Sequence, residues 1–166
     1  MLSHHWYENT QLINWFQFVL ACFYGALLGY ERETQGKPAG IKTHAFVSGA
    51  SCLFVVLSIS IARQFADAMG PDLVNVDPIR IIQSIILGVS FIGAGTIIKD
   101  KSDRVHGLTT AASLLLVVAI GIGVGLGRYF LSLAVTVAAY FFLKVLKMVI
   151  WKMRQEGAND SDDKYY

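Results

Sequence analysis

The sequence predicts an all-α membrane protein, a bundle of five transmembrane helices. Hydrophobic residues make up 54% of the 166 residues, charged residues only 16%, and the mean hydropathy is +0.51. Soluble domains carry about 25% charged residues, so an ordinary soluble domain is excluded. Predominantly apolar runs recur five times, and lysines and arginines gather on alternate connections between them. Both features are typical of a polytopic membrane protein.

The five apolar runs define the expected helices. Each holds 18 to 22 residues, which at about 1.5 Å per residue covers about 27 to 33 Å, the thickness of the hydrocarbon layer. The runs are 12–30, 45–62, 81–98, 108–127 and 129–150. We therefore expect one transmembrane domain over residues 1–150 and a short, disordered cytoplasmic tail over residues 151–166. The connections are too short to form a hydrophobic core of their own.

The first and third runs carry clear signals at their starts. No lysine or arginine precedes residue 12, and the run is longer than the apolar part of a typical signal peptide, so we interpret it as a true span. Before the third run, Asp77 is suited to cap the helix, Pro78 fits the first helical position, and Arg80 follows in the first turn.

The fourth and fifth runs are joined by a very short link. Thr109 and Thr110 open the fourth run after a glycine, and their hydroxyls can cap, bond back to the helix or bridge to a neighbour. Gly127-Arg128 is the only link between the fourth helix and the fifth, which predicts a tight antiparallel hairpin. Lys144 and Lys147 lie near the end of the fifth run, where long side chains reach the headgroups.

The distribution of basic residues predicts the orientation. Eleven lysines and arginines fall on the side of the C-terminus and three on the side of the N-terminus. Because basic residues stay on the cytoplasmic side, we expect an outside N-terminus and a cytoplasmic C-terminus in a bacterial plasma (inner) membrane. The net charge of +2 is too small, and the basic residues too dispersed, to indicate a nucleic-acid partner.

Glycines recur at spacings that suit close helix packing. Lipid offers no hydrophobic drive between helices, so small residues let backbones approach and supply contact energy. We expect tight packing inside the chain at these positions, and the alternatives are a homodimer face or a kinked helix that lines a pathway. The positions are Gly25, Gly29, Gly88, Gly93, Gly95, Gly121 and Gly125.

Several kinds of chemistry find no support in the sequence. No ionisable residue lies deep inside the first four runs, whereas ion-coupled transporters usually keep one at membrane depth. The Gly36-Lys37 pair is followed by Pro38, where a phosphate-binding loop needs Ser or Thr. Hydrolase and metalloprotease motifs do not occur either, so we expect no enzyme.

A concentrated polar stretch links the first two runs over residues 31–44. Such charges normally mark the boundary of a span. The alternative is a loop that folds back onto the bundle, with Glu31 and Glu33 paired to cations or to hydrated Mg²⁺. By topology, Asp77 lies on the other side of the membrane and cannot join them. The candidate functional residues are Glu31, Arg32, Glu33, Lys42, Thr43 and His44, with Asp77, Arg80, Thr109 and Thr110 as further polar positions.

Five motifs in order resemble the MgtC/SapB family of bacterial inner-membrane proteins, over residues 20–128. They are Gly25-x-x-x-Gly29-x-Glu31-Arg32-Glu33, Gly36-Lys37-Pro38-Ala39-Gly40-Ile41-Lys42-Thr43-His44, Asp77-Pro78-x-Arg80, Gly88-Val-Ser-Phe-Ile-Gly93-Ala94-Gly95-Thr96-Ile97-Ile98 and Gly107-Leu108-Thr109-Thr110-Ala111-Ala112. Lys42 stands where the family commonly has arginine, so it keeps the charge without the planar fork. Many relatives add a soluble C-terminal domain, where this sequence has only residues 151–166.

The resemblance implies a protein linked to growth at low Mg²⁺ and, in pathogens, to survival inside host cells. Some family members are described as magnesium transporters, whereas a competing account has them regulate other membrane proteins, including the F-type ATP synthase. We expect action through binding to other membrane proteins or to a second copy. The alternatives are a Mg²⁺ or other cation pathway along the third and fourth helices, and an assembly factor for a larger complex.

Overall fold

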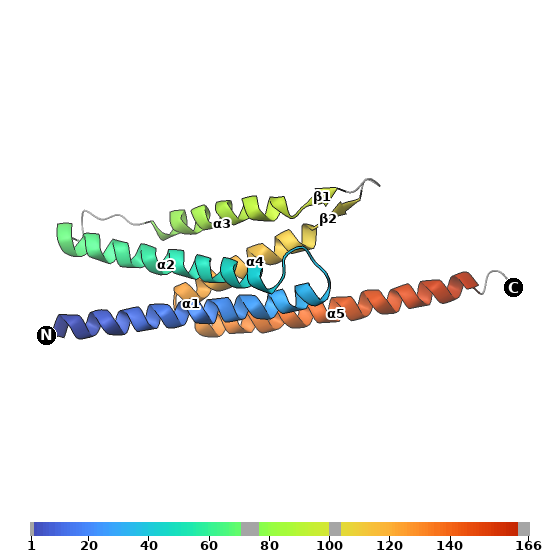
Figure 1. The fold of residues 1–166 in the computed structure, drawn as a ribbon, viewed down its shortest axis with the longest axis horizontal. Coiled ribbons are helices and arrows are strands. Elements are labelled where there is room, and N and C mark those ends of the chain that lie inside the picture. The colour runs from blue at the N-terminus through green and yellow to red at the C-terminus, as the bar shows by residue number, and fades with distance from the viewer. Residues whose placement is uncertain (1, 71–76, 100–103, 163–166) are drawn as a thin grey trace.

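The computed structural model describes residues 2–70, 77–99 and 104–162. Consecutive helices run in opposite directions along one long axis (Figure 1), which confirms the predicted all-α class and the number of helices. The elements are α1 (Leu2–Thr34), α2 (Ile41–Met69), α3 (Pro78–Gly95), β1 (Ile98–Lys99), β2 (Val105–His106), α4 (Leu108–Gly125) and α5 (Tyr129–Asp162).

Within the described residues, four helices are long and apolar enough to cross a membrane. The qualifying segments are Thr10–Thr34, Ile41–Ala68, Leu108–Gly125 and Tyr129–Leu146. The apolar part of α3, Ile79–Gly95, is shorter. The run over 81–98 that predicts the third helix is not helical to its end, because α3 keeps the expected 18 residues but begins and ends three residues earlier.

A small β-hairpin replaces the expected end of the third helix. After Gly95, the Thr96 and Ile97 amides close the last turn on carbonyl oxygens of α3, at 3.0 and 3.1 Å. β1 then pairs with β2 in an antiparallel register. The hairpin returns through Gly107, which has a φ of +91° and lies against the Thr96 carbonyl, where a Cβ would collide. The local sequence pattern does not predict this contact, because the hairpin separates Thr96 from Gly107 along the chain.

The starts of α2 and α3 are fixed by carboxylates. Asp77 caps α3 as predicted, because its side chain accepts a hydrogen bond from the Ile79 amide at 2.9 Å. α2 begins after Gly40, which has no side chain to act as a cap. Glu33, from the end of α1, accepts a hydrogen bond from the Ile41 amide at 2.8 Å instead.

The core lies around α4, the most deeply buried helix. Its residues pack on one side against α1 and α2 and on the other against α2 and α3. The predicted hairpin between α4 and α5 is confirmed, with Gly127 in the link at a φ of +74°. The largest side chains that are fully buried in the core include Leu28 of α1 and Leu114, Val117 and Ile120 of α4.

Five of the seven expected packing glycines lie against a neighbouring helix. Gly25 and Gly29 of α1 meet the start of α2, and Gly121 and Gly125 of α4 meet its middle. A Cβ added at Gly93 of α3 would stand 3.5 Å from the Ala111 Cβ of α4. Gly88 and Gly95 have no atom of another residue within 4 Å of that point among the described residues, so the expectation of packing is wrong for these two.

α5 is longer than the fifth apolar run. It continues as a helix to Asp162 and extends beyond the other helices (Figure 1). Residues 151–162, expected as part of a disordered tail, are therefore helical. Residues 163–166 lie outside the described part of the chain.

Candidate functional site

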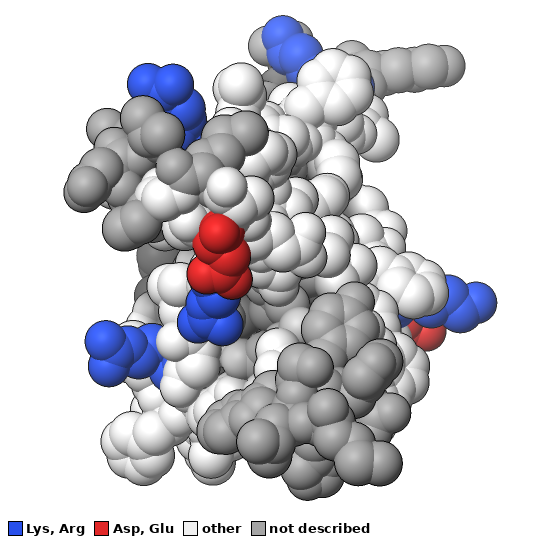
Figure 2. All heavy atoms as spheres, turned by 90° about the vertical axis from the view of Figure 1, so that its left-hand side faces the viewer, with Lys and Arg blue, Asp and Glu red and all other residues white. Residues whose placement is uncertain are grey.

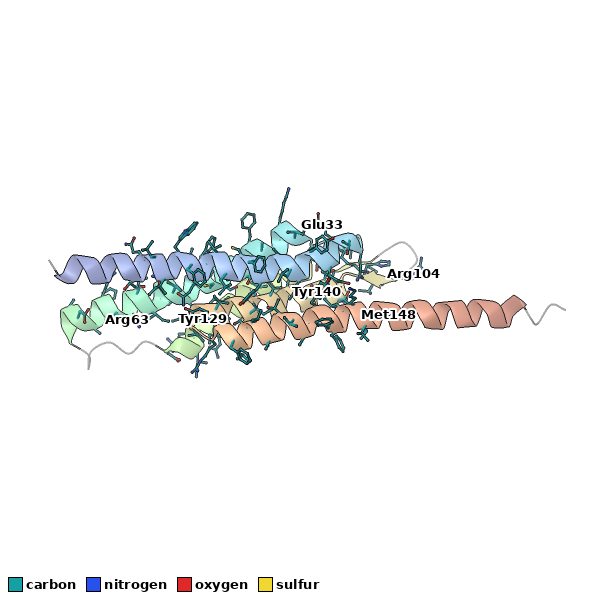
Figure 3. The ribbon with its side chains drawn as sticks, turned by 90° about the horizontal axis from the view of Figure 1, so that it is seen from below. Glu33, Arg63, Arg104, Tyr129, Tyr140 and Met148 are labelled. Carbon is teal, nitrogen blue, oxygen red and sulfur yellow. The ribbon has the colours of Figure 1, made fainter. Side chains whose placement is uncertain are left out.

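The polar residues of the first connection gather where α1 ends and where α2 and α4 begin. Glu31, Arg32 and His44 are all buried there, with exposed fractions of 7%, 5% and 0%. Figure 3 shows Glu33 and Arg104 at this end of the bundle and Arg63 and Tyr129 at the other. Part of the polar stretch is thus buried in the bundle within α1 and α2, whereas Glu33, Lys37 and Lys42 are exposed.

Arg32 joins the last turn of α1 to the first turn of α4. Its Nη2 donates a hydrogen bond to the Thr109 carbonyl oxygen at 3.0 Å, across 77 positions of sequence. A cation in the last turn of a helix is also favoured by the helix dipole. The Arg32 Nε is buried and has no hydrogen-bond partner among the described residues. The guanidinium therefore keeps an unused donor inside the bundle.

Glu31 and Glu33 point to different surroundings. Glu31 is buried, its Oε1 accepts a hydrogen bond from the side-chain Nε2 of Gln35, and its Oε2 has no partner within the described chain. Glu33 is exposed and caps α2. Residues two apart on a helix do not share a face. The two carboxylates are thus not brought together, and the described residues contain no cluster of three His, Cys, Asp or Glu suited to a metal ion.

His44 is the most deeply buried titratable side chain of the site. It packs against Gly25 and Gly29 of α1. A Cβ added at Gly29 would stand 2.9 Å from the His44 Cβ. Its Nδ1 lies 3.0 Å from the Gly40 carbonyl oxygen, which only accepts, so Nδ1 carries a proton. Its Nε2 lies 3.1 Å from the Ser113 Oγ of α4.

The Ser113 hydroxyl has two alternative acceptors. Its Oγ is also 2.8 Å from the Thr110 carbonyl oxygen. When the hydroxyl donates there, His44 Nε2 must be protonated to donate to Ser113. When it donates to Nε2, His44 is neutral. The protonation state of His44 therefore depends on which acceptor the Ser113 hydroxyl of α4 uses, His44 Nε2 or the Thr110 carbonyl oxygen.

The other predicted residues are divided between the two ends. Thr109 is exposed and meets the cluster only through its backbone carbonyl, which accepts from Arg32. Thr110 is buried, and its Oγ1 has no hydrogen-bond partner in the described residues. Lys42 is exposed and Thr43 is half-buried. Asp77 and Arg80 open α3 at the opposite end of the bundle, as the topology predicts.

Six buried polar residues were not among the predicted site residues: Gln17, Ser48, Ser51, Ser113, Ser132 and Thr136. Ser48 follows His44 by one helical turn and is fully buried, and Ser113 is the partner of His44. Gln17 is buried in the first half of α1 and bonds to the Val124 carbonyl oxygen at 3.1 Å. Isolated polar side chains in apolar runs are the signal that identifies them, because a buried polar group needs a partner.

Comparison with known proteins relates the chain to one family. The model of the MgtC family matches residues 18–150. Among the curated relatives, the protein named "Putative magnesium transporter YhiD" of Escherichia coli K12 is 35% identical over 141 residues, 85% of this chain and 64% of that protein. No solved structure gives a significant match.

Two further relatives carry the names of the family. Protein SapB of Bacillus subtilis is 31% identical over 159 residues, 96% of this chain and 65% of its own length. Protein MgtC of Salmonella typhimurium LT2 is 31% identical over 146 residues, 88% of this chain and 58% of its own length. The chain thus spans less than two thirds of each of these three relatives.

Proposed function

Because the chain belongs to the MgtC family, we propose that it is a multi-pass protein of the bacterial inner membrane that acts in Mg²⁺ homeostasis and adaptation to low Mg²⁺. We propose further that it acts by binding other membrane proteins or a second copy of itself. The F-type ATP synthase is the first candidate partner.

The packing of the glycines carries this proposal. Gly25 and Gly121 place the backbones of α1 and α4 directly against α2, at the His44 and Ser48 carbonyls. A Cβ at Gly125 would stand 2.9 Å from the Cys52 carbonyl oxygen. Backbones this close leave no room for a hydrated ion between these helices. The glycines of α4 support a closed bundle and do not line a common pathway with those of α3.

The polar cluster supports a regulatory site at one end of this bundle. Arg32 and His44 tie α1, α2 and α4 together, and Glu31 contributes a buried carboxylate oxygen that is not used within the described chain. A buried, unpartnered acceptor costs free energy unless something outside the chain satisfies it. A donor group of a partner, or a water of hydrated Mg²⁺, meets that requirement.

The second candidate function is a Mg²⁺ or other cation transporter. The relative named "Putative magnesium transporter YhiD" favours it. Three buried oxygens without hydrogen-bond partners in the described chain, Glu31 Oε2, Ser48 Oγ and Thr110 Oγ1, also favour it, since they can accept from the waters of a hydrated ion. A transporter would need the three inner helices to separate, because the glycine contacts close the route between them.

Flux and affinity capture separate the two functions. Purified full-length protein in liposomes loaded with a Mg²⁺ indicator should pass no Mg²⁺, and capture from native membranes should recover a stoichiometric protein partner. Glu31→Gln should reduce that recovery at normal abundance. Glu33→Gln is the matched control, because glutamine keeps an oxygen to cap α2. Mg²⁺ flux that is lost in Glu31→Gln, with no captured partner, would establish the transporter instead.

A further inference from the structure

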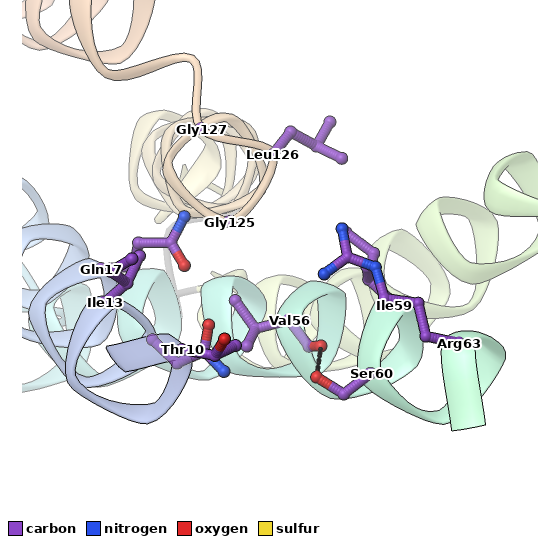
Figure 4. Close-up of a pocket in the computed structure, with 11 residues that line it drawn as sticks. Thr10, Ile13, Gln17, Val56, Ile59, Ser60, Arg63, Gly125, Leu126 and Gly127 are labelled. Carbon is purple, nitrogen blue, oxygen red and sulfur yellow. Dashed lines mark hydrogen bonds between the residues drawn. The ribbon is translucent and has the colours of Figure 1, made fainter. Parts of the chain in front are cut away.

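A pocket of about 350 Å³ lies at the end of the bundle opposite to the polar cluster. Figure 4 shows it between α1, α2 and the end of α4. Its volume falls in the range of about 300 to 1,000 Å³ that is typical of ligand sites. The apolar part of its wall consists of Ile13, Val56, Ile59 and Leu126. The pocket thus has a surface suited to hydrocarbon.

Arg63 supplies the one cationic side chain among the described residues that line the pocket. In Figure 4 its guanidinium reaches from α2 toward the end of α4. Within the described chain Arg63 has neither a hydrogen-bond nor an ion-pair partner, and Asp67, one turn further along α2, is not paired with it. Figure 2 views the molecule from this end, where basic groups outnumber acidic ones among the residues drawn in colour. The guanidinium is therefore available to an anion.

The remaining polar groups of the wall are largely satisfied. Gln17 donates to the Val124 carbonyl oxygen at 3.1 Å and to the Tyr129 Oη at 3.0 Å. The Ser60 hydroxyl donates to the Val56 carbonyl oxygen of its own helix at 2.9 Å. At the end of α4, the Gly127 amide bonds to the Val124 carbonyl and the Arg128 amide to the Gly123 carbonyl, at 2.9 and 2.8 Å. These bonds hold the wall in place and leave Arg63 as the dominant charge.

We propose that this pocket binds an anionic phospholipid, with its phosphate on Arg63 and the upper part of an acyl chain against Ile13 and Ile59. A guanidinium matches a phosphate through two parallel hydrogen bonds. Arg63 lies just beyond the apolar run over 45–62, at the level where headgroups stand. A lipid fills both the charged and the apolar part of the pocket, whereas a free anion fills only the first.

The proposal is tested with the full chain, which is first stripped of lipid in a neutral detergent. The measured quantity is the binding of dioleoyl phosphatidylglycerol to this protein. Native mass spectrometry counts bound lipids, and thermal unfolding gives the apparent affinity. Arg63→Gln should weaken binding at least about tenfold, more than the about fivefold that loss of one surface charge gives by itself. Arg80→Gln removes a charge at the same end outside the pocket, and it should stay within that fivefold limit.

Ser60→Phe provides a second variant that keeps every charge. Its ring should fill the pocket and displace the lipid without lowering the unfolding temperature of the lipid-free protein, because Ser60 bonds only to its own helix. Equal weakening by Arg80→Gln and Arg63→Gln would overturn the proposal, as would wild-type binding by Ser60→Phe. Equal stabilisation by inorganic phosphate alone would overturn the assignment to a lipid.

Discussion

Arg32 is the charged side chain on which the candidate site depends most. It is buried, and its guanidinium connects two helices through the Thr109 carbonyl oxygen. We expect Arg32→Gln to lower the free energy of unfolding by about 2 kcal/mol, because a charged hydrogen bond is lost inside the bundle and Glu31 loses its neighbouring cation. Denaturant unfolding of the purified protein in detergent measures the change.

Lys42→Gln is the control for that measurement. Lys42 is exposed at the same end of the bundle, so its replacement should change the free energy of unfolding by no more than about 0.5 kcal/mol. Equal effects of the two substitutions would mean that Arg32 contributes only charge and that its hydrogen bond to Thr109 adds no stability.

The identity of these residues is predictable, but their partners are not. A polar stretch between apolar runs singles out Glu31, Arg32 and His44 in the sequence alone. Nothing local indicates that Arg32 meets Thr109 or that His44 meets Ser113, since these pairs are 77 and 69 positions apart. The separation of Glu31 from Glu33 follows only once α1 is known to continue as a helix to Thr34.

At the scale of the helices, the glycines provide a matched pair of substitutions. A side chain at Gly121 collides with the backbone of α2 at Ser48, whereas Gly88 of α3 faces open space. We expect Gly121→Leu to lower the free energy of unfolding by about 3 kcal/mol or to prevent folding. Gly88→Leu should stay within about 1 kcal/mol of the wild type, because only helix propensity changes.

The same pair also reports on partner binding. Since Gly88→Leu leaves the bundle intact, a loss of captured partner in this variant would assign the binding surface to α3. Comparable instability of the two variants would mean that Gly88 packs inside the bundle after all. Measurements of abundance and of denaturant unfolding for both variants decide between these outcomes.

The ends of the helices show which helix boundaries can be predicted from local sequence signals. Asp77 and Pro78 predict the start of α3 because a cap and a first-turn proline act within three residues. The end of α3 is set by the hairpin, whose return through Gly107 requires contact with Thr96. The apolar residues of β1 continue the hydrophobic run, so hydropathy alone does not separate strand from helix.

At the scale of the whole molecule, the short α3 decides the topology. With 18 helical residues, α3 measures about 27 Å, slightly less than a hydrocarbon layer of about 30 Å. A short span is accommodated by local thinning of the bilayer at modest cost. α3 runs alongside the longer helices, and the two termini lie at opposite ends of the molecule (Figure 1). We therefore expect five crossings.

Five crossings place the two termini on opposite sides of the membrane, whereas four place them on the same side. We expect green fluorescent protein at the C-terminus of the full chain to be fluorescent and alkaline phosphatase there to be inactive, because eleven of the fourteen basic residues favour a cytoplasmic C-terminus. A protease-cleavable tag at the N-terminus should be cut from outside in intact spheroplasts. An N-terminal tag that is protected there, beside a fluorescent C-terminus, would show that α3 does not cross.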